Sequence, residues 1–328
     1  MFLLLALIEN IILILILHRM EITERSRRKK RKKRLKALFF FIIILGFIVF
    51  LIYRIGSLGK ANLILSPLAE SVEIINETMK NPIQKIAEKK LFAENIKYGI
   101  VVKNLKTGEG YYYNDNEKFQ TASLYKLWAM AAAFEKLSSG QLDENEVLSE
   151  KVEDINANFN IASEEAELTE GEVTRTVKDA IDKMITISDN YSALLLVSRI
   201  RNASLASFLK NYGFNNSNTG SPPQSTAGDI AMFFEKLYKG EIGSKKDSEE
   251  MMEILKRQTF KDRIPKYLPD NISIAHKTGE LGGAKHDAGI VFAKKGDYII
   301  VVLTDSNNPV KTAEKIARFS EEVYKHFE

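Results

Sequence analysis

The chain has 328 residues, of which 45% are hydrophobic and 27% are charged, a balance typical of a folded protein and not of a disordered one. It contains no cysteine, which excludes disulfides, thiolate metal sites and a cysteine nucleophile. Its four histidines are too scattered to suggest a zinc cluster. Residues 1–60 hold thirteen Lys or Arg and three acidic residues, so the rest of the chain is acidic and a nucleic-acid surface there is not expected.

The N-terminal region has the pattern of a membrane anchor. Ala37 to Tyr53 is an uncharged, strongly apolar run, which as a helix spans about 25 Å. Ten of the twelve residues in Arg25–Lys36 are cationic, and such a block stays on the cytoplasmic side. A cleaved signal peptide is the alternative, but this apolar core is longer than usual and no small-residue cleavage site follows it. We therefore expect a single-span protein of the cell membrane, with the chain after Tyr53 outside the cytoplasm.

The first nineteen residues form another apolar stretch, interrupted by Glu9 and Asn10. They are either a further span or an artefact of the start site, with Met20 as the true first residue. Because a glutamate in lipid is costly, we favour the artefact. Either choice leaves the C-terminal body outside. The expected organisation is a basic cytoplasmic segment at 1–36, the anchor at 37–53, a stalk at 54–80 and one catalytic domain at 81–328.

From about Asn81 the sequence predicts an α/β domain whose strands lie near its two ends. Short connections imply an antiparallel sheet of five strands flanked by helices, and the helices between the second and third strands imply an inserted helical lobe. The predicted elements are a helix at Pro82–Phe92, strands at Tyr98–Leu105 and Gly110–Tyr113, a helix-rich region over 123–257, strands at Ile272–Lys277, Ala288–Ala293 and Tyr298–Thr304, and a helix at Val310–Phe327.

Ser123-Leu-Tyr-Lys126 lies where a helix is expected to begin. The spacing of three residues places the hydroxyl and the amine on one helix face. An amine that has lost its proton through burial or a neighbouring cation can accept the serine proton and so activate the oxygen as a nucleophile. The pattern alone is weak, because a serine helix cap is the simpler interpretation. Ser207-Phe-Leu-Lys210 repeats the spacing, and we interpret it as an ordinary helix surface.

Two tripeptides follow. Ser188-Asp189-Asn190 stands between helices predicted at Val173–Ile187 and Tyr191–Arg201, where a helix N-cap is the simplest interpretation. Lys277-Thr278-Gly279 ends the strand predicted at Ile272–Lys277, where a glycine turn is the simplest interpretation. Each tripeptide is individually common, so only their combination is informative.

The three motifs in this order resemble the set shared by class A β-lactamases and penicillin-binding proteins. The resemblance covers the chain from about Asn81 to its end, and it implies a β-lactamase/transpeptidase-like fold. It also implies a β-lactam or a cell-wall peptide as substrate, with neither a metal nor an organic cofactor, and we expect a monomer. Supporting stretches are Gly99-Ile-Val-Val102, Phe119-Gln-Thr-Ala-Ser123 and Ser225-Thr-Ala-Gly-Asp229.

The resemblance implies a role for each motif residue in moving protons and charge. Ser123 is the expected nucleophile that attacks an amide carbonyl, and Lys126 is its proton acceptor. Ser188 relays a proton to the leaving nitrogen. The backbone N–H groups of Ser123 and Glu280 form the expected oxyanion hole.

The remaining motif residues are expected to hold the substrate. Asn190 is implied to hydrogen-bond both Lys126 and the side-chain amide of the substrate. Lys277 and Thr278, followed by Gly279, are implied to bind the substrate carboxylate, and the Lys277 charge also makes the cleft electropositive.

One part of the class A pattern is missing. Those enzymes carry a glutamate on a loop after the second motif, which activates the water that frees the acyl-enzyme. Between Tyr191 and Gly228 this chain has no acidic residue. His276 or His286-Asp287 could supply a substitute base, although a strand residue and a turn pair are the simpler interpretation. Acylation is therefore expected, and fast deacylation is not.

Three functions fit these observations. The first is a membrane-anchored, class A-like serine β-lactamase, which the resemblance over the whole domain favours. The second is a DD-peptidase acting on the stem peptides of the cell wall, which the anchor and the missing glutamate favour. The third is a sensor that is acylated without turnover, which the short cytoplasmic segment disfavours.

Overall fold

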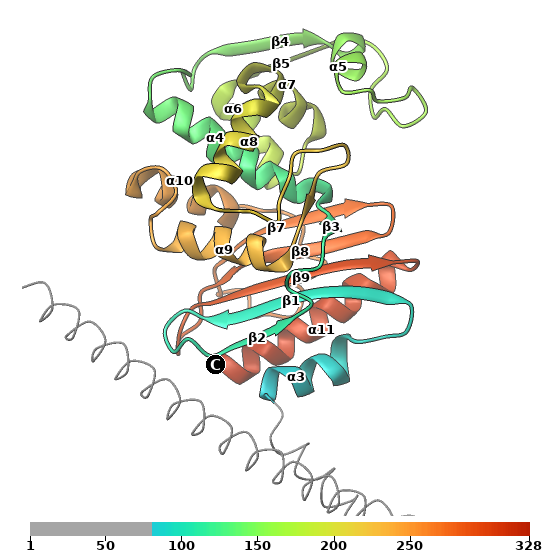
Figure 1. Cartoon of the computed structure of the whole chain (residues 1–328), viewed down its shortest axis with the longest axis vertical. Coiled ribbons are helices and arrows are strands. Elements are labelled where there is room, and N and C mark those ends of the chain that lie inside the picture. Colours follow the sequence, from blue (N-terminus) through green and yellow to red (C-terminus); the bar gives the residue numbers. More distant parts are fainter. Residues whose placement is uncertain (1–80) are drawn as a thin grey trace, which may run out of the picture. The chain divides into compact units, whose positions relative to one another are not determined.

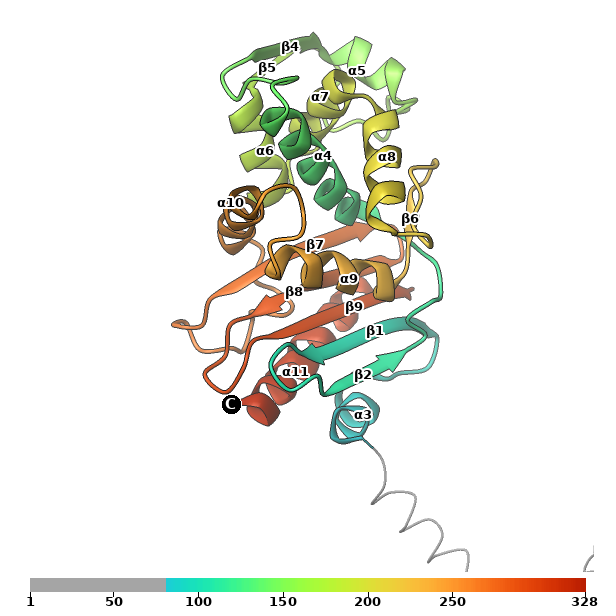
Figure 2. The same ribbon diagram turned by 60° about the vertical axis from the view of Figure 1, so that its left-hand side comes forward.

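The structure, a computed structural model, describes residues 81–328 (Figures 1 and 2). The predicted basic segment, anchor and stalk lie outside the described residues. Between residues 81 and 328, no helix is both long enough and apolar enough to cross a membrane.

A five-stranded antiparallel sheet in the order β2-β1-β9-β8-β7 forms the centre of the domain, which confirms the predicted α/β fold (Figure 1). The N-terminal hairpin pairs with the last strand, so the two ends of the domain meet in one sheet. Alternate residues of a strand face opposite sides, and in β1 the neighbours Ile100 and Val101 are buried on opposite sides of the sheet. The strands are β1 (Ile96–Asn104), β2 (Gly110–Tyr113), β7 (Ile274–Leu281), β8 (Ala284–Val291) and β9 (Tyr298–Ser306).

The third motif lies inside an edge strand and not at its end. The turn predicted at Gly279 is wrong, because Gly279 pairs with His286 in the β7–β8 ladder and the strand continues to Leu281. The chain reverses instead at Gly282, whose φ of +55° suits glycine. β8 consequently begins four residues before the predicted start at Ala288.

One face of the sheet is covered by the C-terminal helix α11 (Pro309–Phe327), as predicted (Figure 1). Ile316, Phe319 and Val323 recur at helical spacing on α11 and are completely buried. The predicted N-terminal helix packs beside them, and its second turn is a π-helix. It consists of α3 (Pro82–Ile86) and the π-helical turn η1 (Ala87–Leu91).

The predicted helical lobe lies between β2 and β7 and is built around α4 (Lys126–Ser138) (Figure 2). Nine consecutive residues of α4, Lys126 to Phe134, are buried, so the helix is enclosed on all sides. α9 (Ala227–Tyr238) covers the second face of the sheet. The other helices are α5 (Val152–Asn158), α6 (Val177–Thr186), α7 (Asn190–Ile200), α8 (Asn202–Tyr212) and α10 (Lys245–Lys256).

The first turn of the helix predicted at Val173–Ile187 is wrong. Residues 172–176 form a strand, β5 (Glu172–Thr176), which pairs with β4 (Val147–Lys151) in a separate two-stranded sheet. The β-branched residues of β5 favour the extended form. Thr176 then ends the strand and caps α6, because its Oγ1 accepts a hydrogen bond from the Asp179 N–H at 3.1 Å.

Candidate active site

Ser123 lies in a 3₁₀ turn, η2 (Ala122–Tyr125), that runs directly into α4. Its side chain makes no capping hydrogen bond to either helix, so the helix-cap interpretation fails. Ala122 has a φ of +45°, a conformation that residues other than glycine rarely adopt and that is frequent at functional sites. The similar spacing at Ser207-Phe-Leu-Lys210 lies on α8 with both polar residues exposed, as the sequence predicted.

The Lys126 side chain is completely buried and lies among oxygen atoms. Its Nζ donates to the Ser188 carbonyl oxygen and to Asn190 Oδ1, both at 2.6 Å, and to Ser188 Oγ at 3.3 Å. Burial lowers the pKa of Lys126 to about 8, and the nearby Asp189 and Glu167 carboxylates oppose that shift. An amine with this pKa is partly unprotonated near neutral pH and can accept a proton.

Ser188-Asp189-Asn190 serves both as the helix cap that the sequence predicted and as the partner of Lys126. Asp189 caps α7, since its Oδ1 accepts from the Ser192 N–H at 2.6 Å. Ser188 has a φ of +58°, and its carbonyl oxygen faces the Lys126 amine. The cap therefore fixes Ser188 and Asn190 on the wall of the helical lobe.

Lys277 approaches the same hydroxyl from the sheet. Its Nζ donates to Ser188 Oγ and to the Thr278 carbonyl oxygen, both at 2.9 Å. Burial and the neighbouring Lys126 cation lower the pKa of Lys277 well below its usual value, with the Arg263 cation acting in the same direction and Asp287 opposing it. Two buried amines, one from α4 and one from β7, thus share one serine hydroxyl, along which a proton can pass.

Gly279 allows the edge strand to lie directly against the turn that carries the nucleophile. A side chain there would place Cβ 2.9 Å from the Thr121 carbonyl oxygen and 3.2 Å from Leu124 Cγ. Since real Cβ atoms do not approach a backbone oxygen so closely, glycine is required for β7 to pack this closely on η2. β7, which carries Glu280, and η2, which carries Ser123, thus pack against each other.

The two histidines considered as substitute bases are structural. His276 Nδ1 lies 2.9 Å from Asp287 Oδ1, and both side chains are buried. His286 Nδ1 accepts from the Thr304 N–H at 3.0 Å, so its Nε2 carries the proton and donates to the Gln120 carbonyl oxygen at 2.8 Å. Burial lowers the pKa of His286 to about 4. With both ring nitrogens engaged, His286 cannot activate a water molecule.

A carboxylate does reach this cluster, but from a segment that precedes the second motif. Glu167 lies in the loop between α5 and β5, and its Oε1 accepts a hydrogen bond from Asn190 Nδ2 at 2.5 Å. Because Glu167 precedes the second motif, it is not among the residues after Tyr191, where the class A pattern has its glutamate. The signal in the sequence is a run of five glutamates between residues 164 and 172, which is ordinarily a solvated surface.

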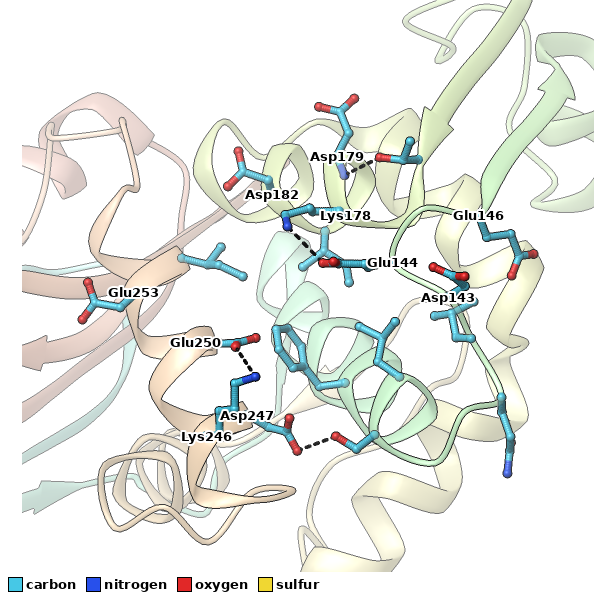
Figure 3. A pocket seen from close by; sticks show the side chains of 18 of the residues that line it. Asp143, Glu144, Glu146, Lys178, Asp179, Asp182, Lys246, Asp247, Glu250 and Glu253 are labelled. Atoms are coloured by element: carbon cyan, nitrogen blue, oxygen red, sulfur yellow. Dashed lines mark hydrogen bonds and ion pairs between the residues drawn. The ribbon is translucent and has the colours of Figure 1, made fainter.

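A groove of about 1540 Å³ lies between α4, α6 and α10, and none of the motif residues lines it (Figure 3). Its lining is acidic, but the charges are paired with one another, as in Lys178–Glu144 at 3.0 Å and Lys246–Glu250 at 3.6 Å. Asp247 accepts from the Ser138 hydroxyl at 2.7 Å. Exposed pairs of this kind describe an ordinary charged surface, so size does not identify the active site here.

The sequence can also be compared with those of known proteins. A sequence model of the beta-lactamase enzyme family matches residues 78–327. The chain belongs to this family. No curated protein matches its sequence.

Solved structures of this family share the fold. The structure of PBP-A superimposes with a TM-score of 0.66 at 24% identity, covering 76% of this chain and 96% of PBP-A. A beta-lactamase from Sphaerobacter thermophilus DSM 20745 gives a TM-score of 0.64 at 21% identity, covering 74% and 95% of the two chains. An ancestral class A beta-lactamase gives 0.63 at 19% identity, covering 75% and 98%.

Proposed function

We propose that this protein opens β-lactam amides through an acyl-enzyme on Ser123. The observation that carries the proposal is the Ser188 hydroxyl, which lies 2.9 Å from the Lys277 amine and 3.3 Å from the Lys126 amine. This arrangement supplies a proton acceptor and a proton relay, and we propose that both act on the Ser123 hydroxyl.

The proposed acylation conserves protons. Lys126, as the free amine, takes the proton from Ser123 Oγ, and that oxygen forms a bond to the lactam carbonyl carbon. The backbone N–H groups of Ser123 and Glu280 stabilise the negative oxygen that develops. The carbon–nitrogen bond then breaks, and the nitrogen takes the proton of Ser188 Oγ, which Lys126 replaces.

The substrate is proposed to lie along β7 and beside α7. Lys277 and Thr278 hold its carboxylate, and Gly279 leaves room for β7 to approach Ser123. Asn190 already donates and accepts within the site, with its Oδ1 on Lys126. We also propose a single-span membrane anchor at Ala37–Tyr53, an extracytoplasmic domain and a monomeric state.

Slow deacylation is part of the proposal. No acidic residue lies between Tyr191 and Gly228, and the one carboxylate bonded to the cluster, Glu167, is engaged by Asn190. This absence favours a second candidate function, a DD-peptidase acting on cell-wall stem peptides. The similarity to PBP-A fits that candidate too, and a PBP-A variant with one leucine replaced by glutamate has been solved as an acyl-enzyme complex with penicillin G.

Labelling with a fluorescent penicillin tests the acylation. The full-length protein in detergent should be labelled, Ser123→Ala should abolish the label, and Ser207→Ala should leave it unchanged. Ser207 is the matched control, since it begins the second Ser-x-x-Lys pattern on an exposed helix face. A labelled Ser123→Ala protein would refute the assignment of the nucleophile.

Intact-protein mass spectrometry after rapid mixing with penicillin tests the second step. A positioned carboxylate that activates water supplies roughly 10²–10⁴-fold in rate, so without it the adduct should persist for minutes or longer. An adduct that decays within a second, with excess hydrolysed penicillin, would contradict slow deacylation.

The membrane orientation of the protein needs a separate test. Protease added to intact spheroplasts should remove residues 81–328, and full protection of these residues would contradict the extracytoplasmic location.

A further inference from the structure

The contact between Glu167 and Asn190 fixes the amide group of Asn190. In its protonated form Lys126 can only donate, so it requires the oxygen of that amide, which lies at 2.6 Å. The Glu167 carboxylate can only accept, so it requires the nitrogen, which lies at 2.5 Å. The two charged partners therefore select one orientation of the amide.

The loop that carries Glu167 is held in place by a buried tyrosine. The Tyr191 hydroxyl donates to Asn156 Oδ1 at 2.8 Å and lies 2.8 Å from the Leu168 carbonyl oxygen. The Leu168 N–H donates back to the same hydroxyl at 3.2 Å, and Asn156 Nδ2 donates to the Leu168 carbonyl oxygen at 2.9 Å. Since Tyr191 directly follows Asn190, these bonds hold Glu167 beside the amide that it contacts.

The second hydrogen of Asn190 Nδ2 has no partner among residues 81–328 and is available to the acyl-amide carbonyl of a substrate. Two acceptors on one NH₂ group, each about 2.9 Å away and about 120° apart, lie about 5 Å from each other. A substituent on the carbon next to that carbonyl therefore comes within reach of the Glu167 carboxylate.

The space beside this contact suits a short side chain with a positive end. A cavity of about 160 Å³ adjoins Asn190, and its walls include Tyr125, Ile161 and Leu194. Within the described part of the chain, Glu167 has no Lys, Arg or His within ion-pair distance, unlike the paired acidic residues of the large groove. Glu165 also lines the cavity, so the acyl side chain of a substrate would meet two carboxylates here, and of these two Glu167 is the one that bonds to Asn190.

We propose that Glu167 is a specificity-determining residue, whose carboxylate favours substrates that bear an ammonium group on the carbon next to the acyl amide. The proposal rests on the proposed function, because it assumes that Asn190 receives the acyl amide of a molecule that acylates Ser123. The same carboxylate positions Asn190, so its charge and its hydrogen bond must be tested apart.

Two penicillins that differ mainly in one group separate these effects. Ampicillin carries an ammonium group next to its acyl amide, and benzylpenicillin carries a hydrogen there. The measurement is the second-order acylation rate of the full-length protein with each drug, expressed as the ratio of ampicillin to benzylpenicillin. Glu167→Gln keeps an oxygen acceptor for Asn190 and loses the charge, Glu167→Ala loses both, and Glu170→Gln is the control for a charge elsewhere on the loop.

We expect Glu167→Gln to lower the ratio about fivefold at low salt, because an exposed ion pair supplies no more than this, and we expect added salt to reduce the difference. The benzylpenicillin rate should fall less in Glu167→Gln than in Glu167→Ala. Glu170→Gln should keep the wild-type ratio. An unchanged ratio in Glu167→Gln, or an equal loss with both drugs, would overturn the specificity role. Absence of acylation by either drug in the wild-type protein would instead overturn the proposed function.

Discussion

The face of the sheet that packs on α11 and the face that meets the helical lobe bury different kinds of side chain. On the α11 side, Ile300 and Val302 meet Phe319 in an apolar cluster. The ionisable side chains of His276 and Asp287 are both buried, and they bond to each other, with Nδ1 2.9 Å from Oδ1. On the lobe side the apolar cluster ends at two buried amines of the same sign, whose shared neighbour is one hydroxyl.

The difference separates stability from chemistry. Burial of apolar area stabilises a fold at about 25 cal/mol per Å², and the α11 side is built almost wholly in this way. A buried amine opposes folding unless it is neutral or paired, and Lys126 and Lys277 both have lowered pKa values for that reason. The lobe side therefore holds groups that are poor for stability and suited to proton transfer.

The largest effect should come from the α11 side. Phe319 is completely buried against the sheet, and Phe319→Ala should lower the free energy of unfolding by about 3–5 kcal/mol. Penicillin labelling of the protein that remains folded should keep its rate per molecule. Thermal unfolding measures the loss of stability, and labelling kinetics measure the acylation rate. Phe319→Leu provides a milder variant if the alanine protein does not fold. A folded Phe319→Leu protein with slowed labelling would remove the separation between the two faces.

Lys126→Ala should have the opposite effect, with a large loss in acylation rate and a small change in stability. Loss of the proton acceptor should slow acylation at least about 100-fold, which corresponds to about 2.7 kcal/mol in the activation free energy. The free energy of unfolding should change by less than in Phe319→Ala, because the substitution removes a buried amine along with its hydrogen bonds. Stopped-flow labelling measures the rate, and Lys210→Ala on exposed α8 is the matched control. Equal rates for Lys126→Ala and wild type would assign proton transfer to another group.

The parts of the site that the sequence predicted correctly are those that depend on local spacing. Ser123 and Lys126 are one helical turn apart, and Ser188 is joined directly to the Asp189 that caps α7, so their placement follows from short-range geometry. Which groups meet between β7 and the helical lobe depends on packing between distant segments. Lys277 could be predicted as a site residue only because the order of the three motifs resembles that of a known family.

Two errors show where local reasoning ends. Gly279 was predicted to form a turn, whereas its conformation is set by its partner strand and its small size is required by a carbonyl more than 150 residues away in sequence. Glu167 belongs to a run of glutamates typical of a surface, and only the bonds of Tyr191 bring it to Asn190. Neither contact has a periodic pattern or a motif that a single sequence could show.

The pH dependence of acylation tests whether the buried amines on the lobe side of the sheet take part in proton transfer. The reactive form of Lys126 is the free amine, which becomes more abundant as the pH rises through its pKa of about 8. The acylation rate should therefore increase about 50-fold between pH 6 and pH 8. Because Lys277 lies close by and is also shifted downward, the observed pKa belongs to the pair. A rate that stays constant over this range, in a protein that remains folded, would exclude a neutral lysine as the base.

The smallest effect tests the close packing of β7 on η2. In Gly279→Ala, the new methyl group would lie 2.9 Å from the Thr121 carbonyl oxygen, so β7 and η2 must move apart by a few tenths of an ångström. Misplacement of reacting groups by about 1 Å costs about 10²-fold, so a loss of about tenfold in acylation is expected for this smaller shift. Gly108→Ala is the control: it has a φ of +76° and open space around it, so it should destabilise the hairpin by about 1–2 kcal/mol and leave acylation unchanged. If Gly279→Ala is acylated as fast as wild type, the close packing of β7 on η2 is not needed for acylation.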